Sequence, residues 1–240
     1  MQLIGLVLLA FVVWYGFLPR EDTTISALDS HAAVMVLGGS LAAVMVSSTA
    51  RTTARTLMAL REIVPLLGTL SVVTEAMEAE RKEVADLWRD GRRSQAVQLA
   101  ERSVHPPIQR MVELVLARAP EEAVRSAYLD LTHAELSRWQ PAVGNWELLA
   151  KLAPSFGMVG TITGMIQLFQ SMGEKDMNLG AAISLALLAT LYGVAFGAGV
   201  AGPIGHYLRN LLDERIGVLE RCEQSVGELV ARTVRGVEGA

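Results

Sequence analysis

Residues 154–203 read PSFGMVGTITGMIQLFQSM, GEKDMNLG and AAISLALLATLYGVAFGAGVAGP, two apolar runs on either side of a short polar turn. About 20 helical residues cross a bilayer core, so each run has spanning or near-spanning length. Glycine recurs in both runs, and Gly160–Gly164 and Gly193–Gly197 have the spacing that lets membrane helices approach closely. The stretch predicts a membrane helical hairpin.

The polar content of this hairpin is limited to hydroxyl groups. Thr161, Thr163, Ser184 and Thr190 lie in the apolar runs, which contain no Asp, Glu, Lys or Arg. The hairpin therefore cannot carry a proton on a carboxylate of its own. Two interpretations stay open for each threonine: a hydroxyl that bonds its own helix backbone and serves packing, or a hydroxyl that serves an ion path.

The composition excludes several classes of protein. The chain has 240 residues, is 51% hydrophobic and carries a net charge of -4. It is too apolar for an ordinary soluble domain, and its charge does not favour a nucleic-acid partner. The single cysteine, Cys222, excludes an intramolecular disulfide and is interpreted as a free thiol. No metal site is predicted, because the four histidines are scattered: His31, His105, His133 and His206.

Two further apolar segments, Gln2–Leu18 and Ala32–Ser47, are predicted to span the membrane. The first lacks the basic start and cleavage site of a signal peptide. The segment 49–151 carries fourteen Lys and Arg, and the tail after Pro203 carries five. The positive-inside rule therefore places this segment and both termini in the cytoplasm.

The remaining segments have helical patterns, with breaks predicted at Gly91, Pro106–Pro107 and Pro141. The predicted fold is all-α: a four-span polytopic membrane helical bundle with a helical cytoplasmic domain formed by the long loop and the C-terminal tail. The predicted parts are 1–50, the first two spans with a short outer loop; 51–151, the cytoplasmic domain; 152–204, the pore-facing hairpin; and 205–240, the C-terminal cytoplasmic helix. No phosphate loop, metal-ligand cluster or nucleophile motif is visible, so we expect neither an enzyme nor a bound cofactor.

The segments PSFGMVGTITGM and ALLATLYG resemble the MotA/TolQ/ExbB family, most closely the MotA/PomA branch of flagellar stator subunits. The four-span layout favours the same branch. Pro154 and Pro203 fall where the family has two prolines that bracket its pore-facing helices. Asp29 lies in a region similar to the branch's first outer loop. From its position alone, Asp29 is equally compatible with a helix cap and with an ion-attracting group at an entrance.

The resemblance implies a pentameric ring of such chains in the bacterial inner membrane, around two copies of a MotB-like single-span subunit that binds peptidoglycan. That partner supplies the ion-carrying aspartate, and the ring turns to drive a FliG-like rotor protein. Thr161 matches a threonine of the third helix that contributes to ion selection, and Thr190 matches one beside the partner's aspartate. Ala189 replaces a threonine common in the family. The translocated ion is Na⁺ or H⁺, and the two threonines slightly favour Na⁺.

The family also carries an arginine and, eight residues later, a glutamate that face the rotor. Arg93 and Glu101 have this spacing, and Arg92 is adjacent. The surrounding residues RRSQAVQLAE differ from the family's pattern, and a solvated helix face is the other interpretation. Two alternative functions stay open: an ExbB/TolQ-like or other non-flagellar ion-driven unit that energises an envelope process, and a membrane scaffold without ion flux.

Overall fold

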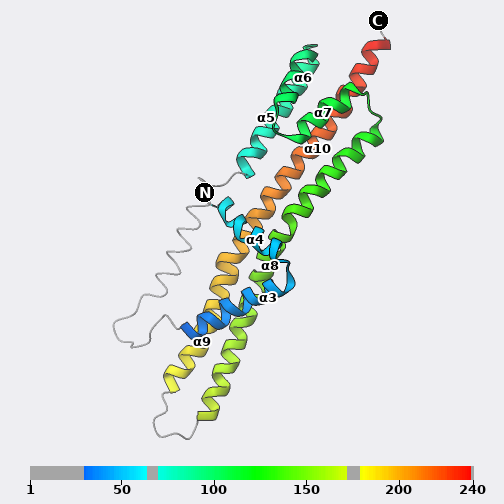
Figure 1. Ribbon diagram of the computed structural model, residues 1–240. Coiled ribbons are helices and arrows are strands. Elements are labelled where there is room, and N and C mark those ends of the chain that lie inside the picture. Colours follow the sequence, from blue (N-terminus) through cyan, green and yellow to red (C-terminus); the bar gives the residue numbers. More distant parts are fainter. Residues whose placement is uncertain (1–29, 64–69, 172–178, 239–240) are drawn as a thin grey trace. The chain divides into compact units, whose positions relative to one another are not determined.

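The computed structural model describes residues 30–63, 70–171 and 179–238, and these segments are helical almost throughout, with no strand among them (Figure 1). The all-α class predicted from the sequence is confirmed. The elements in chain order are α2 (Ser30–Ala33), the π-helix η1 (Val34–Gly38), α3 (Gly39–Ser47), α4 (Ala50–Met58), the 3₁₀-helix η2 (Ala59–Ile63), α5 (Leu70–Arg89), α6 (Arg93–Arg102), α7 (Pro106–Leu116), α8 (Glu121–Ser171), α9 (Leu179–Phe196), the π-helix η3 (Gly197–Ala201) and α10 (Gly202–Glu238).

Two helical stretches in the described part of the chain are long and apolar enough to cross a membrane. They are Glu121–Gln170 and Ala186–Thr233, and they overlap the two predicted runs of the hairpin. Val34–Ser47 is a shorter apolar helix, within the predicted second span. The predicted first span, Gln2–Leu18, lies outside the described residues, so the number of four spans stays a prediction.

The helix break predicted at Pro141 is wrong. α8 continues through Pro141 and Pro154 to Ser171. The ring of Pro141 is exposed, while Ala142, Val143, Asn145 and Trp146 in the next turn are buried. Proline in a helix interior costs about 3 kcal/mol. Burial of these neighbouring side chains offsets this cost.

The chain forms two compact units, which we describe separately. The hairpin unit consists of Met1–Leu57 and Ala142–Tyr207, and the helical unit consists of Met58–Pro141 and Leu208–Ala240. α8 and α10 contribute residues to both units. The domain boundaries predicted from the sequence concern membrane and cytoplasmic parts, and they stay a prediction.

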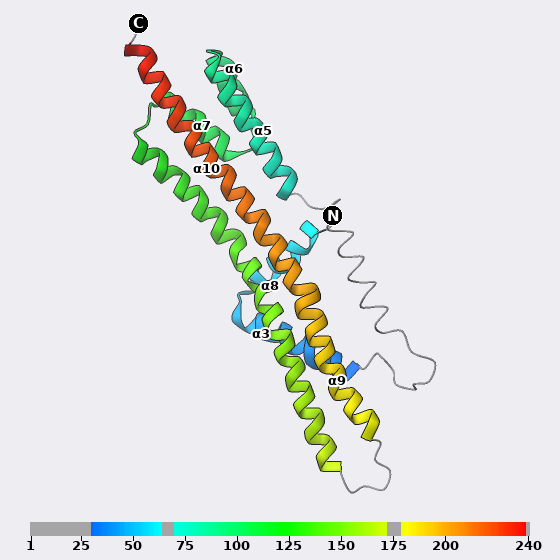
Figure 2. The ribbon, with the colours of Figure 1, turned by 180° about the vertical axis from the view of Figure 1, so that it is seen from behind.

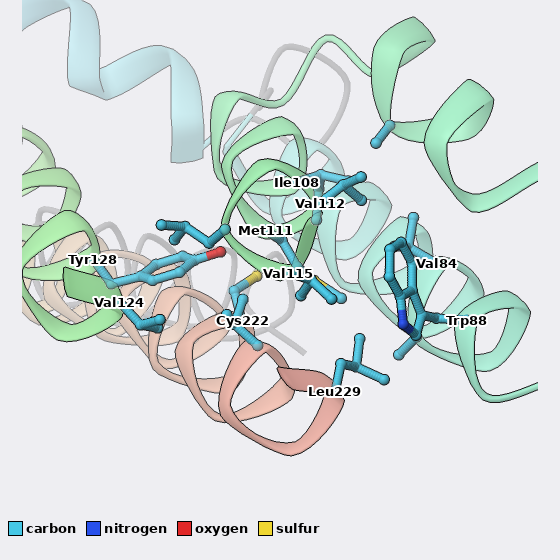
Figure 3. Packing of buried hydrophobic residues seen from close by; sticks show 14 of the residues in the cluster. Val84, Trp88, Ile108, Met111, Val112, Val115, Val124, Tyr128, Cys222 and Leu229 are labelled. Carbon is cyan, nitrogen blue, oxygen red and sulfur yellow. The ribbon is translucent and has the colours of Figure 1, made fainter. Parts of the chain in front are cut away.

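The helical unit is built around one apolar core, to which α5, α6, α7, α8 and α10 all contribute. Figure 3 shows Tyr128 of α8, Met111 of α7 and Cys222 of α10 pointing toward one another. The Tyr128 hydroxyl donates to the backbone oxygen of Pro107 at 3.0 Å, which pairs the polar end of a buried ring. This core gives the helical unit the usual hydrophobic stabilisation of a soluble domain.

Short turns shape the helical unit between α5 and α8. Gly91 has a φ of 80° and follows α5, and the Gly91 and Arg92 amides bond back to the carbonyls of Trp88 and Leu87. This is the common helix ending in which glycine adopts the left-handed conformation. Two prolines open α7, where the missing N–H groups cost nothing. The predicted breaks at these positions are confirmed.

Candidate functional site: a hydroxyl and carbonyl cluster in the hairpin unit

Residues 150–164 of α8 lie against residues 186–197 of α9 and η3, side by side in Figure 1 and Figure 2. A Cβ added at Gly193 would lie 2.5 Å from the carbonyl oxygen of Ala153 and 3.1 Å from the Cα of Gly157. A Cβ added at Gly157 would lie 2.9 Å from the carbonyl oxygen of Ala189. Real Cβ atoms do not approach backbone this closely, so the absence of side chains at Gly157 and Gly193 sets the helix separation.

This close approach brings two threonines together. The hydroxyls of Thr161 on α8 and Thr190 on α9 contact each other. The Thr161 hydroxyl also lies 2.9 Å from the carbonyl oxygen of Ala186 and 3.2 Å from that of Gly157. The Thr190 hydroxyl lies 3.3 Å from the same Gly157 oxygen. Both threonines are half-buried.

We call the oxygens of Thr161, Thr190, Gly157 and Ala186 the oxygen cluster. The two hydroxyls have two protons to donate. Each proton can go to the other hydroxyl or to one of the two carbonyl oxygens. Oxygen atoms of this kind bind hard cations and also donate to a carboxylate. The cluster contains no acidic group, and the apolar runs around it contain none. It can therefore ligate or select a cation, but it cannot store a proton.

Ala189 lies beside this cluster with its methyl group in apolar contact. Its side chain is buried and packs with Ala32, Val36 and Tyr192. A Cβ added at Gly160 would lie 2.6 Å from the Ala189 Cβ. The structure thus places the Ala189 side chain in a packed interface, while its role in an ion path stays a prediction.

A small cavity of about 20 Å³ lies next to Ala189. Its lining includes Met35, Gly160, Thr163 and Gln167. The Thr163 hydroxyl is 3.0 Å from the carbonyl oxygens of both Val159 and Gly160, so it bonds its own helix. A cavity of this size can hold one water molecule. Thr163 fits the packing interpretation, and it differs in this respect from Thr161, which reaches α9.

The two predicted coupling prolines lie where helix hydrogen bonds are missing. Pro154 has no N–H to give the carbonyl of Ala150, and Pro203 has none to give the carbonyl of Gly199. A Cβ added at Gly197 would lie 2.7 Å from the Pro154 ring and 2.8 Å from the Ala150 oxygen. The π-helix η3 begins at this glycine and ends before Pro203. The chain is locally irregular at η3, and a role of the two prolines in conformational coupling stays a prediction.

The predicted rotor-facing residues are all exposed in the helical unit. Arg92 pairs with Asp90 at 2.9 Å, and the Arg93 guanidinium lies over the Trp88 ring, 5.8 Å from its centroid. Glu101 lies near the other end of α6. The predicted entrance residue, Asp29, lies outside the described residues. The structure therefore brings Thr161 and Thr190 together. In its described part, Arg93 and Glu101 lie on the short helix α6, and Arg92 directly precedes this helix.

Sequence reasoning missed a buried polar contact in the hairpin unit. The Asn145 side chain donates to the Thr56 hydroxyl at 2.8 Å, and the Trp146 indole donates to the Thr56 carbonyl at 3.1 Å. These bonds hold α4 against α8 and satisfy polar groups that would otherwise be buried alone. The partners are 89 and 90 residues apart, and nothing in the local pattern of either segment could have paired them.

Sequence reasoning also missed an ion-pair network between α5 and α10 in the helical unit. Glu78 pairs with Arg81 at 2.8 Å and with Arg221 at 3.2 Å. The Arg81 hydrogen bonds, together with that of Arg221, lower the pKa of Glu78 from 4.5 to about 2 against the opposing effect of burial. The spacing of Glu78 and Arg81 signals their helical pairing, but not the contact with Arg221.

The model of the MotA/TolQ/ExbB proton channel family matches residues 96–221. Motility protein A of Aquifex aeolicus is 36% identical over 74 residues, which is 31% of this chain and 29% of that protein. Motility protein A of Treponema phagedenis is 37% identical over 120 residues, or 49% and 42% of the two chains.

These alignments cover less than half of either relative's length. Among solved structures, a chain of C. jejuni MotAB superposes with a TM-score of 0.79, over 96% of this chain and 89% of that one. The identity is 14%, so this likeness concerns the fold. In the described part of the chain, no group of three or more His, Cys, Asp or Glu side chains is arranged to hold a metal ion.

Proposed function

The chain belongs to the MotA/TolQ/ExbB proton channel family, and we propose that it is a MotA-type stator subunit of an ion-driven rotary motor. In this proposal it forms, with a MotB-like partner, an ion channel that converts ion flow into torque on the flagellar rotor. Its relatives named motility protein A and its likeness in fold to a MotAB chain support this proposal. The work it performs is transport and movement, with no catalytic step.

The observation that carries the proposal is the oxygen cluster. It offers four oxygens at a point where two helices almost touch, yet the apolar runs that form it contain no Asp, Glu, Lys or Arg. Ionisable groups inside a membrane are costly and mark function. A channel built on this cluster therefore needs a carboxylate from another chain. A single-span, peptidoglycan-binding partner of MotB type would supply that group.

We place the protein in the bacterial inner membrane with four spans and both termini in the cytoplasm. The distribution of Lys and Arg supports this orientation. The family resemblance supports a ring of five chains around two partner copies. Residues Pro154 and Pro203 are assigned to the conformational coupling of this ring, and Asp29 to its outer entrance.

For the ion path we propose Thr161 and Thr190 as ligands, with Ala189 in the wall beside them. Hydroxyl and carbonyl oxygens can replace the water shell of Na⁺, and the cluster contains both. The same hydroxyls can donate to the partner's carboxylate while it carries H⁺. We favour Na⁺ because both threonines are present. Rotor contact is assigned to Arg92, Arg93 and Glu101, with a FliG-like rotor protein as the partner.

The test compares three variants of the hairpin in cells that carry this chain with its partner. Thr190→Ala removes one hydroxyl from the oxygen cluster, and it should reduce torque and ion flux about tenfold, the value of a lost hydrogen bond to a charged group. Thr190→Ser keeps the hydroxyl and should retain most of the torque. Thr163→Ala is the matched control, because the Thr163 hydroxyl bonds only its own helix carbonyls and the Met35 sulfur.

Torque is measured on tethered cells in sodium-rich and sodium-free medium at fixed pH. Rotation that rises with sodium and is lost in Thr161→Ala supports a sodium-driven stator. Rotation that ignores sodium and stops when the proton gradient collapses makes it proton-driven. Equal, undiminished flux in Thr190→Ala and Thr163→Ala would contradict the ion path and support a scaffold. Motility that persists without this chain would favour the alternative unit that energises another envelope process.

A further inference from the structure

A groove of about 830 Å³ lies in the helical unit, between the first three turns of α8 and the C-terminal half of α10. Its lining residues come from both helices. They are Ala119, Glu121, Val124, Arg125, Tyr128, Leu129 and Thr132 before and along α8, and Glu220, Glu223, Gln224, Gly227, Val230 and Ala231 along α10. The oxygen cluster belongs to the other unit, and the function proposed above makes no use of this groove.

The groove is apolar in its depth and acidic at its edges. Val124 and Tyr128 are buried in its wall. Glu220 and Glu223 line it from α10, and neither forms an ion pair with any residue in the described segments. The same is true of Glu121 and Arg125 on α8. Three carboxylates thus oppose one guanidinium around a partly desolvated surface, which favours a cationic partner.

Gly227 leaves open space in the α10 side of the groove. A Cβ added there would meet nothing within 4 Å, so the packing of this chain does not require a glycine. Gly91 differs from Gly227, because its φ is positive, and a Cβ at Gly217 would meet only the flexible end of the Arg221 side chain. Glycine inside a helix costs about 0.5–1 kcal/mol relative to alanine. In return, a partner's backbone can approach α10 more closely at Gly227 than at a residue with a side chain.

The dimensions of the groove suit a helix. The α8 residues that line it, 121–132, extend over about 18 Å at 1.5 Å per residue, roughly three turns. An amphipathic helix that enters a groove presents contact residues on successive turns. Small residues would pack against Gly227, and basic residues on the following turns would reach Glu223 and Glu220, which lie about one and two turns away along α10.

We propose that this groove binds a helical segment of a partner protein whose contact face combines small residues with lysine or arginine. The partner's small residues lie against Gly227, and its basic residues pair with Glu223 and Glu220. Recognition uses helix-in-groove packing together with charge complementarity. The groove is an interaction surface separate from the candidate ion path and from the candidate rotor contact on α6.

The test uses thiol exchange at the centre of the groove in the full chain, held in phosphatidylcholine nanodiscs. Gly227→Cys introduces a thiol where open space accepts it. Native Cys222 does not compete, because it is fully buried and burial raises the pKa of its thiol to about 12. The probes are two helical peptides, about 18 residues long. One consists of alanine and lysine, and the other of alanine and glutamate. Each peptide carries one cysteine as a mixed disulfide with thionitrobenzoate. Attack by the introduced thiol forms the protein–peptide disulfide and releases the chromophore.

The lysine peptide should react about tenfold faster than the glutamate peptide at Gly227→Cys, as expected for steering by opposite charge. Adding Glu220→Lys and Glu223→Lys should abolish or invert this preference. Ala79→Cys is the matched control: it is exposed on α5 near the acidic Glu75 and Glu83, and it should show a much smaller preference. Equal preferences at the two sites would show that the net charge of the protein causes the difference in rate, and they would overturn the proposal. Rapid disulfide formation between two Gly227→Cys protomers would also overturn it, because a second copy would then occupy the groove.

Discussion

The hairpin unit and the helical unit are both all-helical in their described parts, but different atoms hold them together. In the hairpin unit, backbone meets backbone: Gly157 and Gly193 allow direct contact between α8 and α9, and Thr161 bonds across to the Ala186 carbonyl. In the helical unit, large side chains such as Tyr128 and Met111 fill the space between helices. Ion pairs such as Arg215–Glu135 at 2.9 Å then connect α8 and α10.

This difference follows from the solvent that each unit is suited to. Large apolar side chains of the hairpin unit point outward, with Met158, Ile162 and Phe169 of α8 more than half exposed. In lipid such side chains gain nothing by burial, so close packing and hydrogen bonds must supply the stability. In water the hydrophobic effect dominates, and it needs the buried volume that the helical unit provides. The two units should therefore fail under opposite kinds of substitution.

The largest effect is expected from adding volume to the hairpin. Gly193→Val places a branched side chain against the Ala153 carbonyl and the backbone of Gly157, neither of which can move without separating the helices. We expect loss of the folded hairpin and of all ion flux. The measurement is the fraction of protein that runs as a folded species after extraction in mild detergent, followed by flux in cells.

The control is a glycine of the neighbouring helix α8. A Cβ added at Gly144 would meet nothing within 4 Å. Gly144→Ala should therefore be neutral or stabilising, by about 0.5–1 kcal/mol. A Gly193→Val protein that folds and conducts normally would show that the close approach of α8 and α9 is unnecessary.

An intermediate effect is expected from removing volume from the helical unit. Met111 is fully buried in its core, and Met111→Ala should cost about 3 kcal/mol through lost burial and the cavity left behind. Cys222 lies in the same core, so the rate at which a thiol reagent modifies it reports opening of this unit alone. That rate should rise about a hundredfold, the equivalent of 3 kcal/mol.

Leu116→Ala is the control for this prediction. Leu116 is on the same helix α7 but 57% exposed, and its truncation should change the modification rate less than threefold, or about 0.5 kcal/mol. Similar rates for the two variants would mean that the core in Figure 3 does not limit opening of the unit.

Much of the fold could be predicted because its signals are local. Apolar run length, glycine spacing and the turns at Gly91 and Pro106 depend on neighbours in sequence, and these predictions agree with the structure. The break at Pro141 failed because the burial of Trp146 and its neighbours outweighs a local preference. The contacts of Glu78 with Arg221 and of Asn145 with Thr56 join residues far apart in the chain, where no periodic pattern exists to signal them.

The candidate site follows the same division. Hydroxyls in two apolar runs without charged residues were visible in the sequence, and the family resemblance selected Thr161 and Thr190. Their direct contact, and the carbonyls of Gly157 and Ala186 beside them, depend on the register of α8 against α9. Register is decided by how glycines interlock across two helices. One chain's sequence does not specify which glycine meets which carbonyl.

The smallest effect is expected at the ion pairs of the helical unit, and it should depend on pH. Arg81 and Arg221 lower the pKa of Glu78 from 4.5 to about 2, so the folded unit favours the ionised carboxylate more than the unfolded chain does. This contribution to stability is fully present above about pH 5, and it is lost as the pH falls through 4.5 towards 2. Glu78→Gln should therefore lower the thermal midpoint of the helical unit at pH 7, while near pH 2 it should match the parent protein. Glu83→Gln, five residues further along α5 at an exposed position, should change the midpoint little at either pH. A difference between Glu78→Gln and the parent that is constant over this range would mean that Glu78 acts through packing. The contrast between a charge-paired helical unit and the uncharged apolar runs of the hairpin would then lose its energetic basis.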